Sequence, residues 1–382
     1  MAVNMRDVAK VAGVSPRTVS NVVSGYVHVR AETRERVQRA IDELKYRPNV
    51  SARSLRRGRT GIIALAVPEI AAPYFAELAD LIQQRAGDRG VTLLVDQTGA
   101  SRERELLVLD GYRSHVIDGL ILSPMAITLE DLRAQELDFP TVLLGERIQD
   151  GGLLHVAVDN VAAARTATRH LVETGRRRIA AVGDADNVGP AHRRLQGYRA
   201  ALEEAGLEPD PALTVTTGGW ARATGYAAVR ALLGRGTAVD ALFCFNDVVA
   251  QGAIRAVADH GLRVPDDIAV VGWDDIEEAA YTTPSLTSVS PDKAAIATTA
   301  VDRLLAQISG EVLGEQEVTC GFELVVRESS APRRSPEPSS VPAPVRSPRR
   351  SPPSQGSAQP APRGYGPASA QHAAGSDGRL SM

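Results

Sequence analysis

The stretch RDVAKVAGVSPRTVSNVVSG, residues 6–25, holds the signals that decide how the N-terminal part of the chain folds. Asn4 with Asp7 three residues later is the pattern of a capped helix start, and Gly13 is typical of a helix end. Ser15 then caps a second helix, PRTVSNVV, which is about eight residues long and would be marginal alone. The pattern therefore predicts two short helices that depend on packing against other parts of the chain.

A third helical pattern, ETRERVQRAIDELKY, follows and has one apolar face. Two short helices that are joined through glycine and braced by a third form a helix-turn-helix, so we predict an all-α head over residues 1–47. The expected core positions are Val8, Ala9, Ala12, Val14, Val19 and Val23 in the first two helices, and Val37, Ala40, Ile41 and Leu44 in the third.

Charge is distributed unevenly along the chain. Residues 1–60 carry 13 Lys and Arg against 5 Asp and Glu, although the whole chain of 382 residues has a net charge of −3. Residues 331–382 carry 7 Arg against 2 acidic residues, so the part between these two segments has a net charge of −16. A basic head on an acidic body indicates that the head meets a polyanion.

The second helix of a helix-turn-helix enters the major groove of DNA, where its outward side chains read base edges. Arg17 has the donors to pair with a guanine, and Asn21 has the donor and acceptor to pair with an adenine. Contacts to phosphate position the protein without specifying sequence. The predicted base-facing residues are Pro16, Arg17, Ser20 and Asn21, and the predicted phosphate contacts are Thr18, Arg34, Arg36 and Lys45.

The body, residues 61–330, alternates short β-rich runs with amphipathic helical patterns. Runs such as GIIALAV and IAVVGW are continuously apolar, which is typical of parallel strands covered on both faces. Ten such runs are enough for two sheets, so we predict two doubly wound α/β lobes. Ligands of such sheets bind at the carboxyl ends of the strands, here facing the cleft between the lobes.

Several classes of protein are disfavoured. No apolar run reaches the roughly 18 residues of a membrane span, and the first residues have no signal-peptide core, so we expect a cytoplasmic protein without membrane contact. The chain has no P-loop, HExxH, CxxC or GxSxG motif, and Asp274 and Asp275 are adjacent rather than facing each other, so no enzyme, metal site or cofactor is expected. Cys244 and Cys320 are interpreted as small buried hydrophobic residues.

The last segment, residues 331–382, is rich in Pro, Ser, Arg and Gly. It has too few large apolar residues to offset the entropy of ordering, so we predict a disordered tail.

These motifs together resemble the LacI/GalR family of bacterial transcription regulators. The similarity begins in RDVAKVAGVSPRTVSNVVSG and ETRERVQRAIDELKYRPNVSARSL, continues through FCFNDVVAQGAIRAVADHGLRVPDDIAVVGWDD, and ends at ELVVRES, so it covers residues 1 to about 330. The resemblance implies a body like the periplasmic binding proteins. Its first lobe would span about 61–160 and 291–319, and its second about 161–290 and 320–330.

The resemblance also implies that residues 48–60 are a hinge, which forms a helix only when two subunits sit together on DNA. A segment of this size is below the roughly 12–15 residues needed for an isolated helix, which agrees with folding on DNA. Leu55 would then insert into the minor groove at the operator centre and separate a base step. The implied hinge contacts to DNA are Asn49, Ala52, Arg53, Leu55 and Arg56.

Two positions depart from the family pattern. The family usually has an arginine where this chain has Asn21, so the preference at one operator base is expected to differ. It usually has NPFF or NPYF where this chain reads APYF from Ala72, so one polar pocket contact is expected to be absent.

The family's effector contacts can be carried over to eight positions: Tyr74, Phe75, Ser123, Arg147, Arg194, Trp220, Asn246 and Asp274. This mix of aromatic, cationic and amide side chains favours a polyhydroxylated ligand such as a sugar over a purine or nucleoside. A plainer interpretation, in which the acidic residues at strand ends cap helices, remains open.

The predicted function is a DNA-binding transcriptional repressor of carbohydrate-utilisation genes. A homodimer would bind a palindromic operator, and a sugar-like effector would control it from the cleft. Two alternatives remain open, a corepressor-dependent regulator that responds to a purine or nucleoside, and a sugar-binding receptor without DNA function.

Overall fold

The computed structural model describes residues 3–23, 26, 28–46, 59–111, 117–135, 139–145, 147–148, 152–183, 189–314 and 316–331. The predicted hinge contacts Asn49, Ala52, Arg53, Leu55 and Arg56 lie outside the described residues, as does the tail from residue 332.

The head consists of α1 (Met5–Ala12), α2 (Pro16–Val23) and α3 (Ala31–Glu43). As predicted, Asn4 and Asp7 cap the start of α1 reciprocally, and Gly13 ends the helix with a left-handed φ of 63°. Ser15 Oγ accepts a hydrogen bond from the Thr18 N–H at 3.1 Å, which caps α2. The buried core contains Val8, Ala9, Ala12, Val19, Val22, Val37, Ala40 and Tyr46, with Val14, Val23, Ile41 and Leu44 packed at its margin.

The first lobe is built on a six-stranded sheet in the order β11-β5-β4-β3-β1-β2, with every pair parallel. Alternation along β1 explains why both faces are covered. Ile63 and Leu65 pack under α5 and α12, whereas Ala64 packs under α6 and α7 on the opposite face. The elements are β1 (Ile62–Val67), α5 (Pro73–Asp88), β2 (Thr92–Gln97), α6 (Arg102–Gly111), β3 (Gly119–Leu122), α7 (Leu129–Ala134), β4 (Thr141–Leu144), β5 (Leu154–Val158), α12 (Lys293–Ile308) and β11 (Glu317–Cys320).

The second lobe repeats this plan in the order β12-β10-β9-β8-β6-β7, with only β12 antiparallel to its neighbour. Helices α8 and α9 cover one face, and α10 and α11 cover the other. The elements are α8 (Asn160–Glu173), β6 (Ile179–Val182), α9 (Pro190–Glu204), η2 (Pro211–Leu213), β7 (Thr214–Val215), α10 (Arg222–Gly234), β8 (Ala241–Cys244), α11 (Asp247–Asp259), β9 (Ala269–Trp273), η3 (Glu277–Ala280), β10 (Thr287–Pro291) and β12 (Phe322–Val325).

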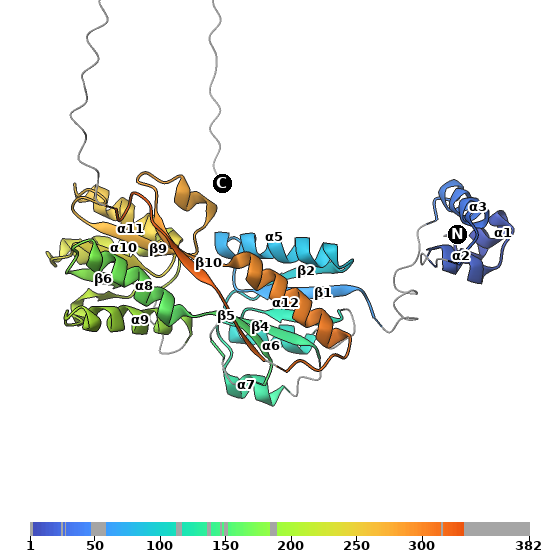
Figure 1. Ribbon diagram of the computed structural model, residues 1–382, viewed down its shortest axis with the longest axis horizontal. Helices are drawn as coiled ribbons and strands as arrows, with labels where there is room; N and C mark the ends of the chain where they lie inside the picture. Colours follow the sequence, from blue (N-terminus) through green and yellow to red (C-terminus); the bar gives the residue numbers. More distant parts are fainter. Residues whose placement is uncertain are drawn as a thin grey trace, which may run out of the picture. The chain divides into compact units, whose positions relative to one another are not determined.

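The chain passes between the two lobes three times, from β5 to α8, from β10 to α12 and from β11 to β12 (Figure 1). Phe322, at the start of the last crossing, packs against the cores of both lobes. The predicted fold class, a helix-turn-helix head with a two-lobed doubly wound body, is confirmed.

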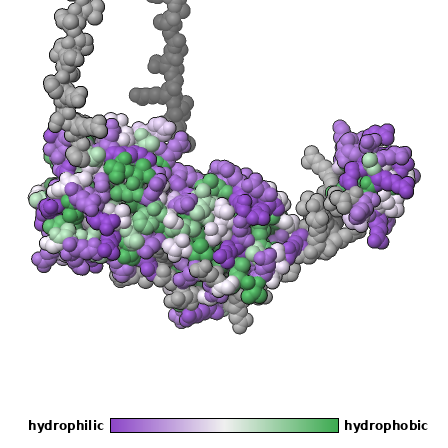
Figure 2. Space-filling view, in the orientation of Figure 1, coloured by the Kyte–Doolittle hydropathy of each residue, from purple (hydrophilic) through white to green (hydrophobic). Residues whose placement is uncertain are grey.

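One further prediction concerns burial. Cys244 and Cys320 are buried free thiols, as expected of small hydrophobic residues. Within the described residues, no helix combines the length and the apolar character needed to cross a membrane. Hydrophilic residues dominate the visible surface of the head, whereas hydrophobic residues gather in patches on the body (Figure 2).

Candidate functional site

The second helix of the head has one face in the core and one facing outward. Val19 and Val22 are buried, so the residues between and before them point away from the head's core. Pro16 and Arg17 are exposed at the start of α2, and Thr18, Ser20 and Asn21 are half-buried. This is the side-chain placement that a recognition helix needs, and the individual base contacts remain predictions.

A cavity of about 780 Å³ lies between the two lobes, lined by residues from both. Most of its polar lining residues stand at or just after the ends of strands, which is where parallel sheets bind ligands, whereas Arg194 and Arg222 come from helices α9 and α10. Seven of the eight predicted effector contacts line it, namely Tyr74, Phe75, Ser123, Arg194, Trp220, Asn246 and Asp274.

Arg194 of α9 is the cation of the second-lobe wall, and it is held in place on three sides. Its Nε donates to Asn160 Oδ1 at 2.7 Å, and its Nη1 donates to the Phe245 carbonyl oxygen. The guanidinium carbon lies 4.0 Å from the centroid of the Trp273 ring, close enough for a cation–π contact. The side chain is 9% exposed, so its orientation is fixed before any ligand arrives.

Asn246 follows β8 and caps the helix after it. Its Oδ1 accepts the Val249 N–H at 2.7 Å as the N-cap of α11. Its Nδ2 donates to the Trp220 carbonyl oxygen at 3.1 Å, which ties the segment bearing the Trp220 ring to the end of β8. Asn246 therefore helps to position Trp220 and also lines the cavity itself.

Asp274 follows β9 and is 8% exposed. It has a φ of 107°, a backbone conformation that residues other than glycine rarely adopt. Burial raises the pKa of its carboxyl to about 7, while the positive charges of Arg194 and Lys293 act in the opposite direction. This carboxyl therefore titrates well above the ordinary range of an aspartate.

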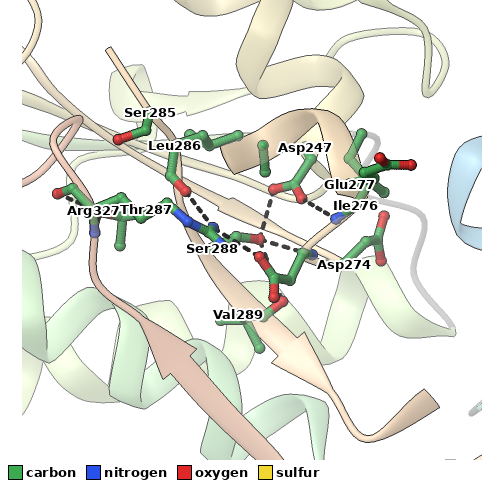
Figure 3. Close-up of polar contacts among 12 residues, drawn as sticks. Asp247, Asp274, Ile276, Glu277, Ser285, Leu286, Thr287, Ser288, Val289 and Arg327 are labelled. Carbon is green, nitrogen blue, oxygen red and sulfur yellow. Dashed lines mark hydrogen bonds and ion pairs between the residues drawn. The ribbon is translucent and has the colours of Figure 1, made fainter. Parts of the chain in front are cut away.

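A buried polar network supports the segment that carries Asp274 (Figure 3). Asp247 Oδ2 accepts the Ile276 N–H at 3.0 Å, and its Oδ1 accepts the Ser288 hydroxyl at 2.6 Å. Ser288 Oγ in turn accepts the Asp275 N–H at 3.0 Å. Burial, together with the charge of Asp274, raises the pKa of Asp247 well above its ordinary value.

Two further residues complete this network. Arg327 Nη1 lies 2.7 Å from Asp275 Oδ1 and also donates to the Leu286 carbonyl oxygen at 2.7 Å. A Cβ at Gly272 would lie 2.1 Å from Asp247 Oδ1, so the buried carboxylate requires glycine at that position. Neither Ser288 nor Arg327 was predicted to take part in the site, because these partners are brought together only by the tertiary fold.

The first-lobe wall is mainly aromatic and apolar. Tyr74 and Phe75 open α5, with ring centroids 5.1 Å apart and planes at 72°. Burial raises the pKa of the Tyr74 phenol, so it stays protonated and can donate a hydrogen bond. Ser123, just after β3, is buried and also lines the cavity. The apolar lining residues of this lobe include Leu78, Met125, Leu144, Val156 and Ile296.

Arg147 requires a correction, because it is absent from the described residues that line the cavity. Its Nε and Nη2 donate instead to the carbonyl oxygens of Ile127 at 3.2 Å and Ala126 at 3.3 Å. The buried carboxylate of Glu105 accepts the N–H groups of the same segment, including that of Met125 at 2.8 Å. Arg147 thus supports the wall behind Met125 rather than facing the cavity.

Four polar lining residues were not predicted, namely Glu69, Gln97, Asn160 and Arg222. Glu69, Gln97 and Asn160 stand at or within two residues of the end of a strand, and that position was the signal available in the sequence. Arg222 opens α10, so no strand end marked it. Across the described parts of the chain, no group of three or more His, Cys, Asp or Glu side chains is placed to hold a metal ion.

Comparisons with known proteins agree with this architecture. The family described as "Bacterial regulatory proteins, lacI family" matches residues 4–49, and the one described as "Periplasmic binding protein-like domain" matches residues 168–330. The HTH-type transcriptional regulator CelR of Thermobifida fusca is 36% identical over 335 residues, which cover 84% of this chain and 96% of that protein. The ribose operon repressor of Halalkalibacterium halodurans is 34% identical over 326 residues, covering 85% and 96%.

Solved structures give the same result. A CelR–cellobiose complex matches with a TM-score of 0.65 and 33% identity, covering 86% of this chain and 99% of that one. A Lac repressor dimer bound to operator and the anti-inducer ONPF matches with a TM-score of 0.77 and 29% identity over the same shares of the two chains.

Proposed function

The chain belongs to the LacI family of bacterial transcriptional regulators, and we propose that it represses carbohydrate-utilisation genes until a sugar binds between its lobes. The observation that carries the proposal is the composition of the cavity. Fixed polar groups on Arg194, Asn246 and Asp274 stand on one side, and aromatic rings of Tyr74 and Phe75 stand on the other. Sugars present hydroxyl groups at their edges, which can bond to the polar wall. They present C–H groups on their faces, which can pack on the aromatic wall.

The first partner is operator DNA. The outward face of α2 would read bases in the major groove, and the basic head would be attracted by phosphates. If about six to ten phosphates are contacted, affinity falls by about 10³–10⁵ between roughly 50 and 200 mM salt. The protein would act in the cytoplasm, where operator DNA lies, and would act by binding rather than by catalysis.

The second partner is another copy of the chain, which makes a palindromic operator the expected target. The Lac repressor in the matching structure is a dimer on its operator. In this chain the edge strand β2 exposes 41% of Leu94 and 39% of Val95, and Leu107 of the nearby α6 is 66% exposed. Exposed apolar residues along a sheet edge are a surface that a partner covers, and we place the dimer contact there.

The first lobe is where the hinge joins the body. Asp118, just before β3, accepts the N–H groups of Thr60 at 2.6 Å and Gly61 at 2.7 Å. A rotation of this lobe would therefore move the attachment points of the two hinges in a dimer. Insertion of Leu55 into the operator stays a proposal from the family resemblance, and a Leu55→Ala change should weaken operator binding far more than non-specific binding.

A sugar is favoured over a purine by the number of hydrogen-bonding groups on the second-lobe wall. The CelR relative was solved with cellobiose, and this supports the same ligand class here. The Tyr74–Phe75 pair also has faces on which a purine would stack, so a nucleoside-responsive regulator remains the second candidate.

Selection of genomic fragments by the purified full-length protein, followed by footprinting, tests the proposal. We expect one palindrome near sugar-uptake or glycosidase genes, and release of the protein by one of a panel of mono- and disaccharides. Arg17→Ala should abolish the footprint at the selected site and leave weak non-specific binding. Equal affinity for the selected fragment and for random DNA would contradict the proposal.

A further inference from the structure

Residues 274–276 join β9 to η3, which begins at Glu277, and Asp274 of this segment lines the cavity. From within their own lobe they are held by Asp247 and Ser288, whose side chains accept the N–H groups of Ile276 and Asp275, each at 3.0 Å (Figure 3). This segment is therefore fixed to the second lobe through its backbone N–H groups.

The same segment is also held from the first lobe, by two side chains. Lys293 Nζ donates to the carbonyl oxygens of Asp274 and Asp275, each at 2.9 Å. Glu77 Oε1 accepts the Glu277 N–H at 2.9 Å, and its other oxygen forms an ion pair with Lys293. One carboxylate and one ammonium group thus make three hydrogen bonds to backbone groups of the opposite lobe.

Both side chains stand on rigid elements of the first lobe. Lys293 is the first residue of α12 and Glu77 lies in α5, and these two helices pack against each other and against the sheet (Figure 1). The Lys293 side chain is 14% exposed and that of Glu77 is 30% exposed, so water screens this pair only partly. The lobes are linked here by charge-assisted hydrogen bonds beside the cavity.

We propose that Glu77 and Lys293 are positioning residues for the effector site, which hold Asp274 toward the cavity from the opposite lobe and so tie effector binding to the closeness of the lobes. The inference rests on the proposed function for the identity of the ligand class. The φ of 107° at Asp274 is a strained conformation that persists only where surrounding contacts hold it, and the Lys293 bonds to the two carbonyls are such contacts.

The electrostatic surroundings of Asp274 give the proposal a distinctive signature. Charged or titratable groups that influence or respond to its carboxyl come from four helices, and they are Arg194 of α9, Lys293 of α12, Glu77 and Tyr74 of α5, and Asp247 of α11. Lys293 lowers the pKa of Asp274 and Glu77 raises it. Removal of the Lys293 charge should therefore raise the pKa of Asp274, and removal of the Glu77 charge should lower it.

The test uses the full-length protein without effector, so that its outcome is independent of which sugar binds. The only two tryptophans in the sequence, Trp220 and Trp273, have ring centroids 5.9 Å and 4.0 Å from the guanidinium carbon of Arg194, so their fluorescence should report the ionisation of Asp274, which follows Trp273. The transition should lie near pH 7 in the wild type and disappear in Asp274→Asn. Lys293→Met should raise its midpoint, and Glu77→Gln should lower it. If Lys293→Met does not fold, the downward shift in Glu77→Gln still tests the proposal.

Hydrogen exchange of the backbone amides supplies the second measurement. The amides of residues 275–277 should exchange faster in Lys293→Met and in Glu77→Ala than in the wild type, and Lys293→Arg should restore part of the protection. The matched controls are Arg303→Met on α12 and Asp80→Asn on α5, which make none of these bonds and should change neither readout. Wild-type midpoints in both Lys293→Met and Glu77→Gln, or wild-type exchange in both Lys293→Met and Glu77→Ala, would overturn the proposal, whatever the operator and sugar experiments show.

Discussion

The two walls of the cavity differ in whether their lining side chains already make hydrogen bonds within the protein. On the second lobe, Arg194 and Asn246 make hydrogen bonds to their own lobe. On the first lobe, Tyr74 and Phe75 contribute half-buried rings that pack mainly against apolar neighbours. Pre-oriented polar groups lose little freedom on binding, so the second lobe is suited to fix the orientation of a ligand, while the first adds contact area as the lobes approach.

The largest effect should come from breaking the polar wall at Arg194. In Arg194→Met, Asn160 Oδ1 and the Phe245 carbonyl lose their donor, and Asp274 loses a nearby positive charge. We expect the free energy of unfolding, measured by urea titration, to fall by about 3–5 kcal/mol. Arg199→Met, at an exposed position of the same helix, is the control and should change it by less than about 0.5 kcal/mol. Equal losses of unfolding free energy in Arg194→Met and Arg199→Met would mean that the hydrogen bonds of Arg194 do not hold the polar wall in place.

A second test concerns the pH dependence of stability. The pKa of Asp274 rises from 3.8 to about 7 on folding, so the folded state binds more protons than the unfolded state between these values. Stability from this group is therefore fully present below about pH 4 and is lost as pH rises toward 7. In the wild type, the free energy of unfolding should fall by about 2–3 kcal/mol between pH 5 and 7 because of this group. In Asp274→Asn this contribution to the fall should be absent.

Asp247 provides the internal check on this measurement. Its pKa is also raised, mainly by burial and partly by the charge of Asp274, so part of the decline should persist in Asp274→Asn. A decline that is unchanged by the substitution would mean that Asp274 is not the group that titrates.

Features that depend on residues close together in the sequence were the ones that could be predicted. The head was predictable because its signals are local, with Asn4, Asp7 and Gly13 marking one helix within ten residues. The second-lobe residues Asn246 and Asp274 were predicted from the family resemblance, and each stands within two residues of the end of an apolar strand, where strand ends meet at one edge of a parallel sheet.

Contacts set by tertiary packing left no such signal. Glu77 and Lys293 lie 216 positions apart, and no periodicity relates them. Arg147 follows β4, so its position in the sequence suggested the cavity, but packing directs its guanidinium to the segment after β3. The reach of a long side chain is decided by its neighbours, which the position of a strand end does not specify.

A third test sharpens the role of the aromatic wall. Phe75→Ala removes a ring that lines the cavity and is half-buried without ligand. We expect affinity for the sugar found by the operator-release panel to fall roughly 10- to 100-fold, because about 1.5–3 kcal/mol of apolar burial is lost. Isothermal calorimetry measures this, and Phe75→Leu should retain most of the affinity. Loss of folding stability as large as that in Arg194→Met would show that the ring serves the core rather than the ligand.

The smallest effect is expected at Arg147, and it decides between a supporting residue and a ligand contact. Arg147→Met removes two hydrogen bonds to the Ala126 and Ile127 carbonyls, while Glu105 still holds the N–H groups of that segment. A partly supported segment shifts little, so affinity for the sugar should fall less than about fivefold, which corresponds to about 1 kcal/mol. A direct charged contact to the ligand would instead weaken binding by more than about tenfold, because hydrogen bonds to charged groups contribute about 1.5–3 kcal/mol. A loss of that size would mean that the first lobe also supplies a polar anchor once the ligand is bound, and the division of labour between the two walls would hold only for the empty cavity.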